Sequence, residues 1–90
     1  MSAERVEMIR ERLTKTLQPA ELEIIDESAR HAGHAGAASG GGHFIVNIVA
    51  AAFNDKTLIQ RHRLVYDAVD DIMHTEIHAL SIQAKTPQES

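Results

Sequence analysis

The chain has 90 residues, enough for one domain (residues 1–90) with a single modest hydrophobic core and too few for two. It has no cysteine, which excludes a disulfide framework, a thiolate nucleophile and a metal site built from its own thiolates. The absence of cysteine makes a reducing, cytoplasmic setting the expected location. No apolar run approaches the roughly 20 residues of a membrane span, so we expect no membrane contact. The formal net charge of -4 argues against broad neutralisation of nucleic-acid phosphates, although a local basic patch is compatible with it.

The first predicted elements are a helix and a strand. Apolar residues recur at helical spacing from about residue 3 to 17, and Pro19 cannot continue the helix. The apolar stripe consists of Val6, Ile9, Leu13 and Leu17. Residues 22–28 then mix apolar and polar side chains in a way that is typical of a half-buried strand. We expect the stripe of the helix to pack on the sheet.

The glycine-rich stretch 31–43 holds three of the six histidines, His31, His34 and His43. The apolar runs 22–25 and 44–49 on either side predict two strands of an antiparallel pair. A connection of this length is uncommon in a compact domain unless it is functional or disordered. We interpret it as a functional loop; the alternative is a flexible connection whose histidines are merely solvated.

The near-continuous apolar run 44–49 predicts a central strand with both faces largely covered. A turn follows at residues 53–56, and Thr57 is the expected N-cap of a helical region from residue 58 to 73. This region is either one helix or a short turn with a longer helix. Its expected apolar face consists of Leu58, Val65, Val69 and Ile72, and Arg61 and Arg63 fall mostly on another face.

The last predicted element is a strand over residues 77–84, where apolar and polar residues alternate. The alternation puts His78, Leu80 and Ile82 on one face. Residues 87–90 are expected to form a frayed tail. The order is therefore α-β-β-α(α)-β, a small α+β domain with helices on one face of a three-stranded sheet.

Six short motifs occur along the chain in an order that resembles the BolA-like family. They are Asp26-Glu27-Ser28, His31-Ala32-Gly33-His34-Ala35-Gly36, His43-Phe44, Arg61-His62-Arg63-Leu64-Val65-Tyr66, Ile77-His78-Ala79-Leu80 and Lys85-Thr86-Pro87. The resemblance implies a class II KH-like fold and a non-enzymatic role as partner of a monothiol glutaredoxin. In that partnership a [2Fe-2S] cluster is bridged between the two proteins, for iron-sulfur trafficking or iron-status signalling.

The resemblance also implies the cluster ligands. They match His31 in the loop and His78 near the start of the last strand, with His34 as the competing loop ligand. Imidazole can complete an iron-sulfur site when another molecule supplies thiolates. Those thiolates would come from the glutaredoxin cysteine and a glutathione, so the chain alone should hold no cluster tightly. Without the resemblance, His78 is interpreted as a core-rim histidine bonded to a backbone carbonyl.

Lys56, Arg61 and Arg63 form the basic cluster of the sequence, with His62 between the two arginines. It is either a contact surface for an acidic partner or nucleic acid, or a solvated helix face. A DNA-binding transcriptional regulator is therefore the alternative function. An RNA clamp of the KH type is disfavoured because no glycine follows Gly42. We find no catalytic constellation, and we expect a monomer or weak homodimer when the chain is alone.

Overall fold

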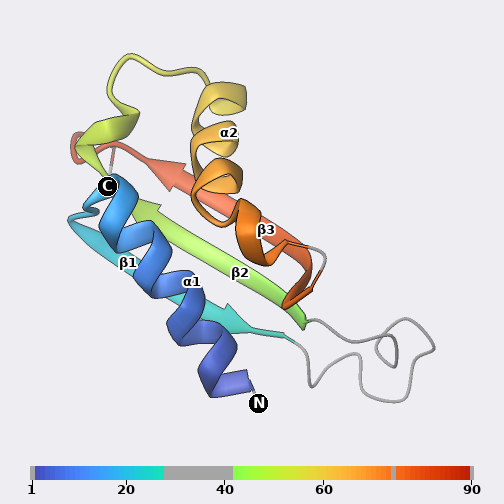
Figure 1. Cartoon of the computed structure of the whole chain (residues 1–90). Helices are drawn as coiled ribbons and strands as arrows, with labels where there is room; N and C mark the ends of the chain where they lie inside the picture. The colour runs from blue at the N-terminus through green and yellow to red at the C-terminus, as the bar shows by residue number, and fades with distance from the viewer. Residues whose placement is uncertain (1, 28–41, 74, 90) are drawn as a thin grey trace.

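The chain folds into two layers, a three-stranded sheet and a helical layer on one of its faces (Figure 1). The computed structural model describes residues 2–27, 42–73 and 75–89. The elements in chain order are α1 (Ser2–Leu17), β1 (Glu21–Asp26), β2 (Gly42–Val49), the 3-10 turn η3 (Ala51–Phe53), α2 (Leu58–Ala68), the 3-10 turn η4 (Asp70–Ile72) and β3 (Ile77–Lys85). The sheet order is β1-β2-β3, with β1 antiparallel and β3 parallel to β2. The predicted α+β class, element order and one-sided helical layer are confirmed.

Helix α1 covers the sheet with its apolar stripe, as its spacing predicts. The buried residues of the stripe are Ile9, Leu13 and Leu17. Gln18 ends the helix in the left-handed conformation, with φ of 47°, and its N–H donates to the Thr14 carbonyl at 3.1 Å. Because Pro19 follows directly, the helix cannot extend further.

Strand β2 is central in the sheet, as predicted, and the described helices cover one of its faces. The residues that it buries under the helices are Phe44, Val46 and Ile48. On the opposite face, Ile45 and Val49 remain partly exposed. The prediction of a strand with both faces largely covered is confirmed for the face under the helices; on the other face the side chains are of intermediate burial, and both described helices pack on the first side of the sheet.

The turn before α2 contains a residue with a left-handed backbone conformation. Asp55 has a φ of 62°, a left-handed conformation that Asp tolerates better than most residues. Thr57 then caps the helix, as predicted: its Oγ1 accepts the Gln60 N–H at 3.2 Å. In return, Gln60 Oε1 accepts the Thr57 N–H at 2.9 Å. This capping box satisfies two backbone donors at the start of α2.

The capping box gives a first testable prediction. Thr57→Ala is expected to lower the free energy of unfolding by about 1 kcal/mol, because the Gln60 N–H loses its acceptor. Thr57→Ser keeps the hydroxyl and should stay within about 0.5 kcal/mol of the parent chain. Urea denaturation followed by circular dichroism measures both variants, and equal losses would show that the side-chain methyl group matters rather than the cap.

The helical region 58–73, which contains α2 and η4, buries a different set of residues from the predicted one. Val65, Val69 and Ile72 are buried, as expected, but Leu58 is 65% exposed. Arg61 is only 8% exposed, although its side chain was expected to lie on another face. Because Arg61, Val65 and Val69 are four residues apart, they lie on one stripe of the helix. Arg61 therefore takes the inward position predicted for Leu58.

Residues 86–89 form a turn packed against α2, so the prediction of a frayed tail is wrong. Thr86 is buried, and its N–H donates to Glu89 Oε1 at 2.8 Å. Arg61 donates to both Glu89 carboxylate oxygens, from Nη1 at 2.7 Å and from Nη2 at 3.2 Å. These bonds from Arg61, followed by the one from the Thr86 N–H, lower the pKa of Glu89 to about 2.

Candidate functional site

His78 lies at a β-bulge near the start of β3. Gly42 pairs with Ile77 and His43 pairs with Ala79, so one step along β2 matches two steps along β3. The extra residue on β3 is His78. The bulge shifts the alternation, so Ile77 is fully buried and His78 is exposed. The prediction that His78 shares the inward face of Leu80 is therefore wrong.

Both attachment points of segment 28–41 lie at the same end of the sheet as His78 (Figure 1). On one side, the Glu27 N–H donates to the His43 carbonyl at 2.8 Å. On the other, the Gly42 N–H donates to the Glu76 carbonyl at 3.1 Å. The predicted loop ligands His31 and His34 belong to this segment and lie outside the described residues. The fold thus brings the ends of their segment to the end of the sheet that carries His78.

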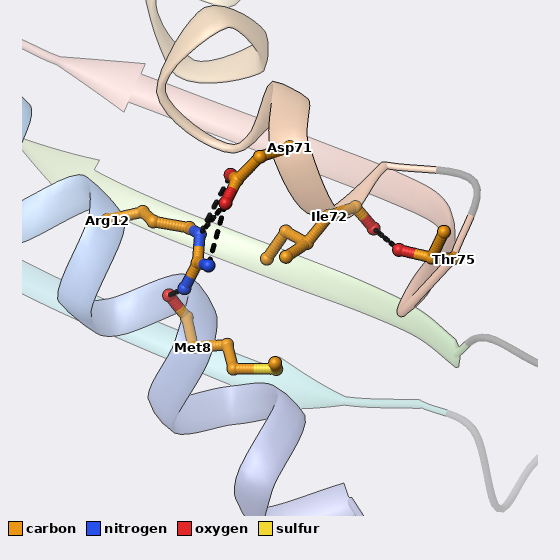
Figure 2. A network of polar contacts seen from close by, with 5 residues as sticks. All are labelled: Met8, Arg12, Asp71, Ile72 and Thr75. Carbon is orange, nitrogen blue, oxygen red and sulfur yellow. Dashed lines mark hydrogen bonds and ion pairs between the residues drawn. The ribbon is translucent and has the colours of Figure 1, made fainter.

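Two ion pairs tie α1 to the segment that leads into β3. Arg12 donates from Nε and Nη2 to the Asp71 carboxylate, with a shortest distance of 2.7 Å, and from Nη1 to the Met8 carbonyl at 3.3 Å (Figure 2). Hydrogen bonds from Arg12 hold the pKa of Asp71 below its ordinary value. Arg5 pairs with Glu76 at 3.2 Å. These contacts help to hold the segment before β3 in place, and with it His78 at this end of the sheet.

The imidazole of His78 makes no hydrogen bond or ion pair with another described residue. The alternative interpretation, a histidine at the rim of the core bonded to a backbone carbonyl, therefore finds no such carbonyl among the described residues. A neutral imidazole in this state has a free nitrogen lone pair for a metal. By contrast, His43 is partly buried, and its Nε2 lies 3.3 Å from Ser81 Oγ.

One imidazole does not make a complete metal site. No group of three or more potential ligands gathers anywhere within residues 2–27, 42–73 and 75–89. The chain also contributes no thiolate, since it has no cysteine. A metal centre that requires thiolate ligands would therefore have to take them from a second molecule.

The predicted basic cluster is divided by the fold. Lys56 and Arg63 are exposed, and His62 is partly exposed. Arg61 turns inward: its Nε donates to the Lys56 carbonyl at 3.0 Å and its Nη1 to the Ala84 carbonyl at 3.1 Å. The hydrogen bonds to Glu89 raise the pKa of the Arg61 guanidinium, which stays charged. Arg61 thus joins α2, β3 and the C-terminal turn, and its guanidinium is not available to bind a partner.

The sequence does not predict the ion pair between Arg61 and Glu89, although it indicates the inward position of Arg61. Four-residue spacing from Val65 and Val69 indicates that Arg61 faces inward. Nothing local indicates Glu89, which is 28 positions away in the sequence. The Tyr66 hydroxyl donates to the Leu80 carbonyl at 3.1 Å, a contact that no local sequence pattern indicates.

Comparison with known proteins finds a matching family and similar relatives. The sequence profile of the family described as BolA-like protein matches residues 13–89. The chain is 47% identical over 89 residues to Protein BOLA1, chloroplastic, from Arabidopsis thaliana, a match that covers 96% of this chain and 56% of that protein. It is 37% identical over 83 residues to the DNA-binding transcriptional regulator BolA from Escherichia coli (strain K12), covering 92% of this chain and 76% of the regulator. Neither relative is named as an enzyme.

The fold is also similar to a solved structure, the BolA domain of SufE1 from Arabidopsis thaliana. The TM-score is 0.80 at 49% sequence identity, and the match covers 93% of each chain. The chain spans about half the length of several curated relatives that it matches. The similarity therefore concerns this domain rather than the whole of the longer proteins.

Proposed function

The chain belongs to the BolA-like family, and on this premise we propose that it is a non-enzymatic partner of a monothiol glutaredoxin. The two proteins share a bridged [2Fe-2S] cluster, for iron-sulfur trafficking or iron signalling. The observation that carries the proposal is His78, an exposed imidazole without a partner among the described residues. It lies where both ends of the histidine-bearing segment 28–41 meet the sheet.

His78 supplies one ligand nitrogen in this proposal, and His31 supplies the second, with His34 as the alternative. The glutaredoxin cysteine and a glutathione provide the thiolates that the chain lacks. The cluster contributes one-electron chemistry and iron for transfer, and imidazole ligands tune its potential. The residues of this chain hold and orient their imidazoles, and the ordered β3 strand fixes the position of His78.

The experiment that tests the proposal is to mix the protein with a cluster-loaded monothiol glutaredoxin and glutathione. Size, visible absorption and visible circular dichroism are followed together. We expect a one-to-one complex whose cluster spectrum differs from that of the glutaredoxin alone. An unchanged spectrum without complex formation would contradict the proposal.

A second candidate is DNA binding for transcription regulation, which is favoured by the name of the Escherichia coli relative. The exposed side chains of Lys56, in the turn before α2, and of Arg63, on α2, would contact phosphates together with the partly exposed His62. Arg61 has no part in this surface because its guanidinium is buried against Glu89 and Ala84.

Salt dependence tests the DNA candidate. With two or three phosphate contacts, affinity for a DNA duplex should fall roughly 10- to 40-fold between about 50 and about 200 mM salt. Fluorescence anisotropy with a labelled duplex measures this slope, and Arg63→Gln should flatten it by about one ion. Equal binding at both salt concentrations, or a slope unchanged in Arg63→Gln, would remove this candidate.

The cytoplasmic location and the monomer or weak homodimer stay predictions. Within the described part of the chain, no helix is both long and apolar enough to cross a bilayer. The plant relative carries the word chloroplastic in its name. Location is therefore to be measured by fusion to a fluorescent protein, and oligomeric state by light scattering.

A further inference from the structure

The open face of the sheet, which is the face opposite the described helices, carries apolar residues that contact water (Figure 1). Ile25 of β1 is 37% exposed, and its cross-strand partner Ile45 is partly exposed. Val49 lies on the same face further along β2, and it is also partly exposed. A sheet with one covered face usually alternates apolar residues inside with polar residues outside. These three β-branched residues depart from that pattern and offer apolar surface to a partner.

Opposite charges lie at the two edges of the open face. Glu21 pairs with Val49, and Val49 pairs with Lys85, so the carboxylate and the ammonium belong to one row with β2 between them. Their backbones are about 9.5 Å apart, which is two strand spacings. Both side chains are exposed, and neither makes a hydrogen bond or an ion pair with another described residue. Each charge is therefore available to a partner.

A hollow of about 560 Å³ lies between the two charges. Its lining includes Glu21, Glu23, Asn47 and Lys85. Asn47 Nδ2 donates to Glu23 Oε1 at 3.1 Å, so these two side chains already bond to each other. An occupant of the open face must therefore bring a cation to Glu21 and an anion to Lys85.

A second copy of the chain has this charge pattern. If two open faces meet about a two-fold axis parallel to β2, β1 of each copy lies over β3 of the other. Glu21 of each copy then faces Lys85 of the other, which gives two reciprocal ion pairs. Ile45 and Val49 lie near the axis and meet their own counterparts. A two-fold axis perpendicular to the strands would place β1 over β1 and leave both lysines without a carboxylate, so charge complementarity selects the first arrangement.

We propose that the chain self-associates through the open face as a two-fold symmetric dimer, with the helices of each copy on the outside. The footprint spans three strands and residues 43–49 of β2, about 330 Å² per copy at about 4.8 Å between strands and about 3.3 Å per residue. A standard stable interface buries about 800 Å² per partner, so we expect a weak dimer that is half-formed at roughly 0.1–1 mM chain. The ion pairs lie at the opposite end of the sheet from His78, so the dimer face is distinct from the proposed cluster ligand.

The test uses the chain alone, without glutaredoxin or cluster, so its outcome does not depend on the proposed function. Spectra of the ¹⁵N-labelled chain are recorded by nuclear magnetic resonance at low salt from about 20 µM to about 2 mM, with sedimentation velocity on the same samples. We expect concentration-dependent amide shifts at residues 21–25, 43–49 and 79–85. Shifts confined to the helices, or no self-association at about 2 mM, would overturn the proposal.

Charge exchange tests how the two copies are arranged. Glu21→Lys and Lys85→Glu each place like charges opposite one another, and each should weaken self-association about tenfold. An equimolar mixture of the two variants restores both ion pairs between unlike chains, and the double variant restores them between like chains. Both should recover the parent affinity to within about twofold. A mixture that associates no better than the single variants would contradict the two-fold arrangement and overturn the proposal.

Glu11→Lys and Lys15→Glu are the matched controls. They make the same changes of net charge at exposed positions of α1, on the other side of the sheet. Each should leave the dissociation constant within about twofold of the parent value. If Lys15→Glu weakened association as much as Lys85→Glu, net charge rather than the open face would govern it, and the proposal would be wrong.

Discussion

His78→Ala is expected to abolish stable sharing of the cluster with the glutaredoxin. Removing a residue that only supports a metal ligand commonly costs about 10- to 100-fold in metal affinity, so removing the ligand itself should cost at least as much. Folding should be unaffected, because the imidazole is exposed and makes no bond with another described residue. Visible circular dichroism of the mixed complex measures the loss, and thermal unfolding of the variant alone measures the fold.

His43→Ala is the matched control for this experiment. His43 lies at the same end of the sheet, and it pairs with the residue that follows His78, but its ring contacts Ser81. We expect this variant to keep the spectrum of the shared cluster. His31→Ala and His34→Ala should differ from each other, since only one of these residues is expected to be a ligand. A normal cluster spectrum in His78→Ala would exclude His78 as a ligand.

Arg61→Ala is expected to cause the largest loss of stability among the exchanges considered. The guanidinium joins the Lys56 carbonyl, the Ala84 carbonyl and the Glu89 carboxylate, so its removal leaves acceptors on three segments without their donor. A decrease in Tm on the order of 5 °C or more is expected for a domain of this size. Arg63→Ala, on the exposed side of the same helix, is the control and should leave Tm nearly unchanged.

The ion pair between Arg61 and Glu89 makes the free energy of unfolding depend on pH in a predictable direction. Its pKa is lowered from 4.5 to about 2 in the folded chain, so its stabilising contribution is present above 4.5 and is lost as the pH falls toward 2. Glu89→Gln should therefore be less stable than the parent chain near neutral pH, and this difference should disappear near pH 2. Urea denaturation at several pH values measures the difference. A difference that does not change with pH would mean that Glu89 acts through packing rather than charge.

The sequence predicts the elements whose signals are local. The α1 stripe, the turn at residues 53–56 and the Thr57 cap each depend on residues within a few positions of one another. The antiparallel pairing of β1 and β2 follows from two apolar runs joined by one segment. These features were correctly predicted because short-range patterns determine them.

The features that were missed depend on long-range contacts. Arg61 is buried because Glu89 and Ala84 reach it from distant parts of the chain, and the same contacts order the C-terminal turn. The bulge at His78 arises from register with β2, which strict alternation along β3 cannot reveal. For the candidate site, residue types and family resemblance named His78, but only the fold shows that its imidazole is exposed near both ends of segment 28–41.

Direct detection of histidine nitrogen at the shared cluster is the measurement that we would make first. Only this chain is labelled with ¹⁵N-histidine, the complex with an unlabelled glutaredoxin is reduced, and pulsed electron paramagnetic resonance is recorded. We predict ¹⁵N hyperfine coupling from directly bound imidazole in the complex of the parent chain. A cluster signal from the complex without any ¹⁵N coupling would contradict ligation by this chain.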